Sequence, residues 1–179
     1  MICQHSILIR KDCLYCDPID SHKRKSVITI LQILLNSLLR WFAPILSFTT
    51  EEIFKLISKD KKSVHLEKFI KFPKKFNNPD LFFKWNKLIK IRDICNLSIE
   101  EKRVTKIIGS SLEASLTIKL NKEDLDLVKD IDLKELCIVS SVLLEEIKKE
   151  QIIVETNKAI GEKCPVCWKI SPTKCERHP

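Results

Sequence analysis

Glycine is scarce in this sequence: its 179 residues include only Gly109 and Gly161. A typical chain of this length would hold about twelve glycines. A glycine-rich loop that wraps its backbone amides around phosphate groups therefore cannot be built, which argues against a nucleotide site in this chain. With 44% hydrophobic and 31% charged residues, the composition is still that of a folded globular protein.

Long apolar runs are also missing. The longest, residues 27–39, is interrupted by four polar residues and is shorter than the roughly 20 residues that a membrane-spanning helix needs. Charged residues begin at Arg10, too early for the apolar part of a signal peptide. We therefore expect a soluble, cytoplasmic protein with no membrane partner, in which the eight cysteines are thiols or metal ligands rather than disulfides.

Positive charge is concentrated in the first part of the chain. Residues 1–106 hold 21 Lys or Arg against 11 Asp or Glu, whereas residues 107–179 hold 11 against 13. The densest basic stretch, residues 59–90, interleaves ten lysines with six aromatic residues. Such a mixture suits phosphates and unstacked bases of a nucleic acid. A solvated lysine face over a core that uses the aromatics is the alternative, and composition alone favours it.

The hydrophobic pattern predicts helices in the first half. Residues 22–42 are apolar on most of the helical circumference and carry one narrow polar stripe, so several neighbours must cover this helix, as in a bundle. Pro44 breaks or kinks it. The run Thr49-Thr50-Glu51-Glu52 predicts a capping box that begins a second, short helix.

The second half predicts a long helix and then a small α+β module. Asn78-Pro79 is typical of a helix start, and this helix should continue to about residue 107. Residues 115–120 alternate as a strand does, and residues 136–144 and 151–155 indicate further strands. Asn121 should cap a short helix between the first two strands.

The last cysteines form the most specific pattern in the sequence. Cys164 and Cys167, followed by Cys175 and His178, give the spacing C-x2-C-x7-C-x2-H. Zinc takes four nitrogen or sulfur ligands in a tetrahedron, and two such pairs would complete its shell with no open position. The segment is too short to bury a core, so we expect a structural zinc ion to hold it together. A chance cluster in a cysteine-rich chain is the alternative.

Several segments together resemble the C-terminal part of bacterial isoleucyl-tRNA synthetases. Residues 40–52 (RWFAPILSFTTEE) resemble the signature RW-x-AP-x-L-x-F-T-x-EE of the class I anticodon-binding helical domain. Four further segments resemble motifs of this family: residues 10–17 (RKDCLYCD), 63–66 (SVHL), 106–114 (KIIGSSLEA) and 161–168 (GEKCPVCW). The third of these favours isoleucyl over valyl or leucyl enzymes. The family usually ends in a second C-x2-C pair, whereas His178 stands at the last of these positions here.

This resemblance implies a fold that is mainly α with a small α+β part. Residues 1–75 would be an incomplete anticodon-binding helical bundle, residues 76–157 the long helix with the α+β module, and residues 158–179 a zinc-binding loop. The family joins isoleucine to its tRNA with ATP, but its catalytic domain and signatures are absent from this sequence. We therefore expect an inactive, tRNA-binding portion that does not itself bind ATP.

The implied partners are isoleucine tRNA and a separate catalytic fragment of the same synthetase. A free-standing RNA-binding module and a non-functional remnant of a truncated gene are the alternatives. Candidate tRNA contacts are Arg40, Lys84, Lys87, Arg92, Arg103, Trp168, Lys169, Lys174 and Arg177. Because the family's earlier bundle helices lie before the first matching residue, some apolar residues of the first helix should stay exposed. The candidates are Val27, Ile30, Leu34, Leu38 and Trp41.

Overall fold

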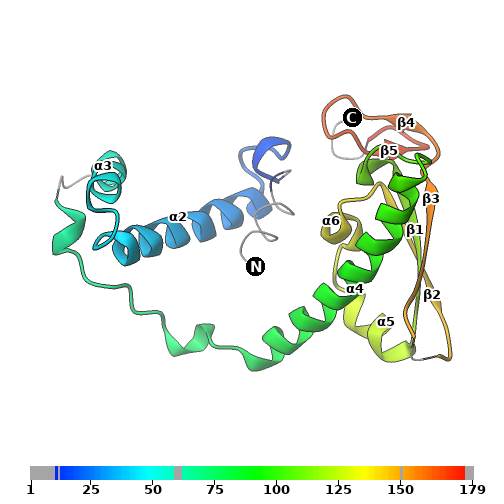
Figure 1. Ribbon diagram of the computed structural model, residues 1–179, viewed down its shortest axis with the longest axis horizontal. Helices are drawn as coiled ribbons and strands as arrows, with labels where there is room; N and C mark the ends of the chain where they lie inside the picture. Colours follow the sequence, from blue (N-terminus) through cyan, green and yellow to red (C-terminus); the bar gives the residue numbers. More distant parts are fainter. Residues whose placement is uncertain (1–10, 12, 59–61, 150, 176–179) are drawn as a thin grey trace. The chain divides into compact units, whose positions relative to one another are not determined.

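The computed structural model describes residues 11, 13–58, 62–149 and 151–175 (Figure 1). The chain divides into two compact units. One unit is Asp17–Asn77, and the other runs from Asn78 onward together with the segment that ends at Cys16. Among the described residues, no helix is both long and apolar enough to cross a membrane.

The Asp17–Asn77 unit is built from two helices and two short 3-10 turns. These are α2 (His22–Phe42), α3 (Ser47–Ile57), η1 (Val64–Leu66) and η2 (Lys74–Phe76). The Ser21 hydroxyl caps α2 by accepting from the Arg24 amide at 3.4 Å. The core between α2, α3 and η1 is small and consists of Leu39, Ala43, Phe54 and Val64, with Ile53 packed against it. The predicted helix at residues 22–42 is therefore confirmed.

The expected capping box at Thr49 is wrong, because α3 begins two residues earlier, at Ser47. The amides of Ile45 and Leu46 both donate to the Phe42 carbonyl, so the chain turns tightly after Pro44 and is already helical at Ser47. Leu46 is the N-cap residue and makes no side-chain capping bond. The turn after Pro44, rather than a cap at Thr49, thus sets the start of this helix.

One side of α2 stays in solvent, as expected. Ile30, Leu38 and Trp41 are exposed, while Val27 and Leu34 are half-buried. Leu38 is 42% exposed although its neighbour Leu39 is only 4% exposed, which marks the edge between the covered and the open side.

The second unit is organised by the long helix α4 (Pro79–Val104). The Asn78 side chain accepts from the Leu81 amide at 3.0 Å, and Pro79 occupies the first turn, which confirms the predicted start. Four residues on the inner side of the helix are buried in the core: Leu88, Ile91, Cys95 and Ile99. At its end, Lys106 has φ 58°, and the amide of Ile107 donates to Lys102 at 3.1 Å. A left-handed residue followed by such a bond forms a Schellman-type helix end.

A three-stranded mixed sheet packs against α4. Its order is β2 (Ser141–Glu146), β1 (Ala114–Leu120), β3 (Ile153–Lys158), with β2 parallel and β3 antiparallel to β1. The alternate residues Ala114, Leu116, Ile118 and Leu120 are fully buried, as the period of two predicts. Helices α5 (Lys122–Val128) and α6 (Leu133–Cys137) connect the two parallel strands.

The strand predicted at residues 136–144 is only partly correct. Its first residues form the end of α6 and a left-handed turn at Ile138 with φ 57°. The Asp132 side chain caps this helix by accepting from the Glu135 amide at 3.2 Å. An apolar run alone does not distinguish a buried helix from a strand, but the Asp-x-x-Glu pattern before it is a helix signal.

Candidate functional site

The cysteine-rich end forms a small hairpin. Strands β4 (Glu162–Lys163) and β5 (Ile170–Ser171) pair antiparallel, and the Cys-Pro-Val-Cys-Trp segment makes the turn between them. The Trp168 amide donates to the Cys164 carbonyl at 3.0 Å, and the Cys164 amide donates to the Lys169 carbonyl at 2.9 Å. These bonds fold the turn so that the sulfur atoms of Cys164 and Cys167 face the same space.

Gly161 is required where it stands, just before β4. Its φ is 134°, and a Cβ placed there would lie 2.1 Å from the Ser171 carbonyl oxygen. Any side chain would therefore push the two strands of the hairpin apart. The sequence contains only two glycines, and this one is needed to close the hairpin.

Three sulfur atoms meet inside this hairpin. The side chains of Cys164, Cys167 and Cys175 lie within 4.8 Å of one another, and the Sγ atoms of Cys167 and Cys175 are 3.7 Å apart. Cys164 and Cys167 are buried and Cys175 is half-buried. Burial, opposed by the Lys169 backbone and assisted by the two nearby thiols, raises the pKa of Cys167 to about 11.

This arrangement fits a metal ion. Three thiols at such short distances repel one another once they ionise, and a divalent cation removes that cost. Three sulfurs on a tight turn and a neighbouring loop provide most of the tetrahedral shell that a structural ion needs. His178 and Arg177, the other predicted residues of this region, lie outside the described residues.

The hairpin is tied to the α+β unit through Ser140. The Ile170 amide donates to the Ser140 hydroxyl at 2.7 Å, and that hydroxyl donates to the Leu112 carbonyl. Leu112 belongs to the segment at residues 106–114 that the sequence singled out. The motif thus lies beside the hairpin that carries the three clustered cysteines.

Arg40, a predicted tRNA contact, is bound inside its own unit. Its guanidinium donates to Glu67 Oε2 at 3.0 Å and to the Asn36 carbonyl at 2.9 Å. It also lies 5.6 Å from the centre of the Phe54 ring. Only 13% of its side chain is exposed, so its geometry is that of a packing residue. The sequence did not indicate that Glu67 and Phe54 would contact Arg40.

Arg92 is buried, contrary to the expectation that it contacts phosphates. Its residue is 5% exposed, and its Nε atom donates to the Leu136 carbonyl at 3.0 Å, at the end of α6. The Nη1 atom has no hydrogen-bond partner within the part of the chain that the structure describes. Arg92 directly follows Ile91, which lies on the core side of α4, so the helix places Arg92 next to the core.

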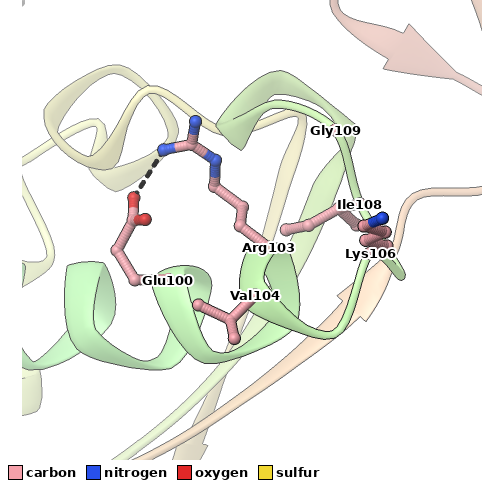
Figure 2. Close-up of a pocket in the computed structure, with 6 residues that line it drawn as sticks. All are labelled: Glu100, Arg103, Val104, Lys106, Ile108 and Gly109. Atoms are coloured by element: carbon pink, nitrogen blue, oxygen red, sulfur yellow. Dashed lines mark hydrogen bonds and ion pairs between the residues drawn. The ribbon is translucent and has the colours of Figure 1, made fainter.

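The other basic candidates of α4 are at the surface. Lys84 and Lys87 are half-buried, and Lys87 lies 3.8 Å from Asp124 and 5.7 Å from the Phe83 ring. Arg103 pairs with Glu100 at 2.7 Å. Figure 2 shows this pair at the end of α4 together with Lys106 and Gly109. These residues line an open pocket of about 370 Å³.

Aromatic and basic side chains also lie at the cysteine-rich turn. Trp168 is exposed and has a left-handed backbone conformation, with φ 63°. Lys163 lies 5.4 Å from the centre of that ring, a contact that the sequence did not predict. Lys174 is exposed and Lys169 is half-buried. Of the predicted contacts in this module, the described residues Trp168, Lys169 and Lys174 therefore lie close in sequence to the three clustered cysteines.

Comparison with known proteins identifies the class. A model of the family described as "Anticodon-binding domain of tRNA ligase" matches residues 1–119. The chain therefore belongs to this family of anticodon-binding domains.

Similar proteins include the isoleucine–tRNA ligases of several bacteria. The ligase of Pelagibacter ubique is 59% identical over 170 residues, covering 95% of this chain and 19% of the relative. Those of Bradyrhizobium diazoefficiens and Agrobacterium fabrum are 38% and 36% identical, covering 92% and 91% of this chain and 18% of each relative. The chain thus spans about a fifth of the length of these relatives, in their C-terminal portion. The resemblance seen in the sequence motifs is confirmed.

Proposed function

We propose that this chain binds the anticodon arm of isoleucine tRNA on behalf of an isoleucine–tRNA ligase. The observation that carries the proposal is the match to the anticodon-binding family over residues 1–119. ATP-dependent joining of isoleucine to the tRNA would be performed by the catalytic domain of that ligase, on the same polypeptide or on a separate fragment. This chain would hold the tRNA in place for that reaction.

The proposal includes one structural zinc ion, held by Cys164, Cys167 and Cys175. His178 is the proposed fourth ligand, because two residues separate it from Cys175, as two residues separate Cys164 from Cys167. Zinc suits three sulfurs and one nitrogen in a tetrahedron. A shell of four protein ligands leaves no place for a substrate, so the ion would stabilise the hairpin and position Trp168 rather than take part in chemistry.

Electrostatics supports the RNA partner. The net charge is +8, and the excess of positive charge falls in residues 1–106. The pair Arg103–Glu100 lies at the surface, where an ion pair contributes about 0–1 kcal/mol. Such a weak partner can be exchanged for a phosphate at small cost. Lys84, Lys87 and Arg103, with Trp168, Lys169, Lys174 and Arg177 at the hairpin, are the proposed contacts.

The test is a titration of the whole chain with isoleucine tRNA and with the same tRNA carrying a different anticodon, over a range of salt concentrations. Affinity should fall steeply with salt, because each phosphate contact releases counterions. It should also fall when the anticodon is changed. An affinity that does not depend on salt, or a preference for duplex DNA over tRNA, would contradict the proposal. Repeating the titration after a chelator has removed the metal tests whether the cysteine-rich hairpin contributes to tRNA binding.

A further inference from the structure

One segment of the Asp17–Asn77 unit has an unusual amino-acid composition. Residues 68–76, here called the Lys/Phe segment, read Lys-Phe-Ile-Lys-Phe-Pro-Lys-Lys-Phe. Nine positions hold four lysines, three phenylalanines and no acidic residue. The segment connects η1 to the turn η2 and ends just before the helix cap at Asn78.

The three phenylalanine rings of this segment do not belong to the core of the unit. Phe69 and Phe76 are both 63% exposed and Phe72 is 47% exposed, and the core cluster formed by Leu39, Ala43, Phe54 and Val64 contains none of them. Full burial of a phenylalanine stabilises a protein by about 1.5–3 kcal/mol. Three rings left in water on one short segment therefore indicate a surface that is covered by a ligand.

The rings lie on backbone outside the longer helices and the sheet. Residues 67–73 form no helix or strand, and Pro73 has φ −58° and ψ 141°. The Phe76 amide donates to the Pro73 carbonyl at 3.0 Å and closes the turn η2, which carries the third ring.

The charge of the segment is not neutralised within the molecule. Lys68, Lys71, Lys74 and Lys75 make no ion pair within the ranges that the structure describes, and Lys75 contacts only the Phe76 ring at 5.8 Å. The adjacent acid, Glu67, is bound to Arg40 at 3.0 Å. The ligand of this surface should therefore be an anion with flat apolar groups.

We propose that the Lys/Phe segment is a stacking platform for unpaired bases of an RNA loop. The rings of Phe69, Phe72 and Phe76 stack on bases, and the intervening lysines contact the phosphates between them. Exposed aromatic rings that alternate with cations bind single strands in this way. This inference rests on the proposed function, since the family match that includes the segment indicates an anticodon loop as the RNA. It adds which residues hold the loop and by which contact.

The test uses the whole chain and an RNA hairpin with a loop of unpaired bases, with blunt duplex RNA for comparison. The variants Phe69→Leu, Phe72→Leu and Phe76→Leu keep an apolar side chain but remove the ring. Each should weaken hairpin binding by about 5- to 100-fold, leave duplex binding unchanged and leave the salt dependence unchanged. Tyr15→Leu, at another exposed aromatic residue, is the matched control and should bind as the parent does.

The lysines provide a separate readout. Lys71→Gln combined with Lys74→Gln should reduce the slope of log affinity against log salt by about 1.4, since each lost contact to a single strand removes about 0.7. If the triple Phe→Leu variant binds the hairpin like the parent chain, the inference is overturned although tRNA binding itself stands. The same holds if these variants lose binding to anionic lipid vesicles but not to RNA. If the parent chain binds no tRNA at all, the proposed function fails as well.

Discussion

The carboxylate of Glu51 accepts a hydrogen bond from the hydroxyl of Ser63 at 2.9 Å. The same Oε2 atom accepts from the Val64 amide, also at 2.9 Å, and Lys55 pairs with the other oxygen at 3.1 Å. Two of the sequence motifs, FTTEE in α3 and SVHL at η1, are thereby joined by one side chain. Glu51 thereby ties the start of η1 to the first half of α3.

The first prediction concerns the pH dependence of this contact. The Ser63 hydroxyl, and then the Val64 amide and Lys55, hold the pKa of Glu51 below its ordinary value of 4.5. A lowered pKa in the folded state means that the ionised group stabilises the fold above about pH 4.5, and that this contribution is lost as pH falls through the lower folded pKa. Glu51→Gln should therefore melt at a lower temperature than the parent at neutral pH, and the difference should shrink below pH 4.5. Glu52→Gln, at the exposed neighbouring position, should melt like the parent; an equal loss in both variants would contradict the assignment.

The second prediction concerns the metal ion. Purified chain should carry about one zinc ion, and Cys164→Ser should abolish this content because it removes one of three sulfurs that lie within 4.8 Å. His178→Ala should weaken zinc binding, measured by competition with a chelator. Cys16→Ser changes a cysteine outside the cluster and should retain the metal. A preparation without zinc, or a Cys164→Ser variant with unchanged zinc content, would exclude the site.

The third prediction compares the two glycines. Gly161→Ala places a Cβ 2.1 Å from the Ser171 carbonyl oxygen at a φ of 134°, so it should destabilise the hairpin by about 3 kcal/mol or more and weaken zinc binding in parallel. Gly109→Ala meets only the Glu113 carboxylate, at 3.6 Å, and should change zinc affinity little. The zinc affinity of both variants tests this prediction. An equal loss of affinity in both would argue against the closed hairpin.

The fourth prediction separates a packing arginine from an RNA-binding one. Arg40→Ala breaks the bonds to Glu67 and Asn36 and should lower the free energy of unfolding by about 1–3 kcal/mol, measured in urea. Arg103→Ala removes a surface pair with Glu100 and should cost about 0–1 kcal/mol, while it reduces the salt dependence of tRNA binding. The reverse pattern would show that Arg40 faces the RNA and that Arg103 does not.

Much of this fold could be predicted from local signals. The Asn78-Pro79 start of α4, the alternation in β1 and the cap at Asn121 depend on backbone groups a few residues apart. The C-x2-C spacing likewise places two sulfurs on one turn. These features are confirmed because the physics that produces them acts within a few residues of the chain.

Features that depend on distant contacts could not be predicted in this way. The pairing of Arg40 with Glu67 joins positions 27 residues apart, so the sequence shows a basic residue but not that Glu67 already pairs with it. The burial of Arg92 depends on α6, whose end it contacts 44 residues later. The capping box expected at Thr49 is wrong for a local reason, because the turn after Pro44 satisfies two amides with one carbonyl and α3 starts at Ser47.

The last prediction uses the boundary on α2 between Leu38 and Leu39. Leu38 is 42% exposed and Leu39 is 4% exposed, so adjacent residues of the same type lie on the open and the covered side of one helix. Leu39→Glu places a charge in the small core with Phe54 and Val64, where an unpaired charge is strongly unfavourable, and it should unfold the Asp17–Asn77 unit. Leu38→Glu interrupts the exposed apolar surface that continues through Trp41, so it should leave the helix content unchanged while it reduces self-association and the fluorescence of a dye that binds apolar surface. Circular dichroism and sedimentation of the two variants distinguish these effects, and equal unfolding of both would show that the open side of α2 is covered in solution.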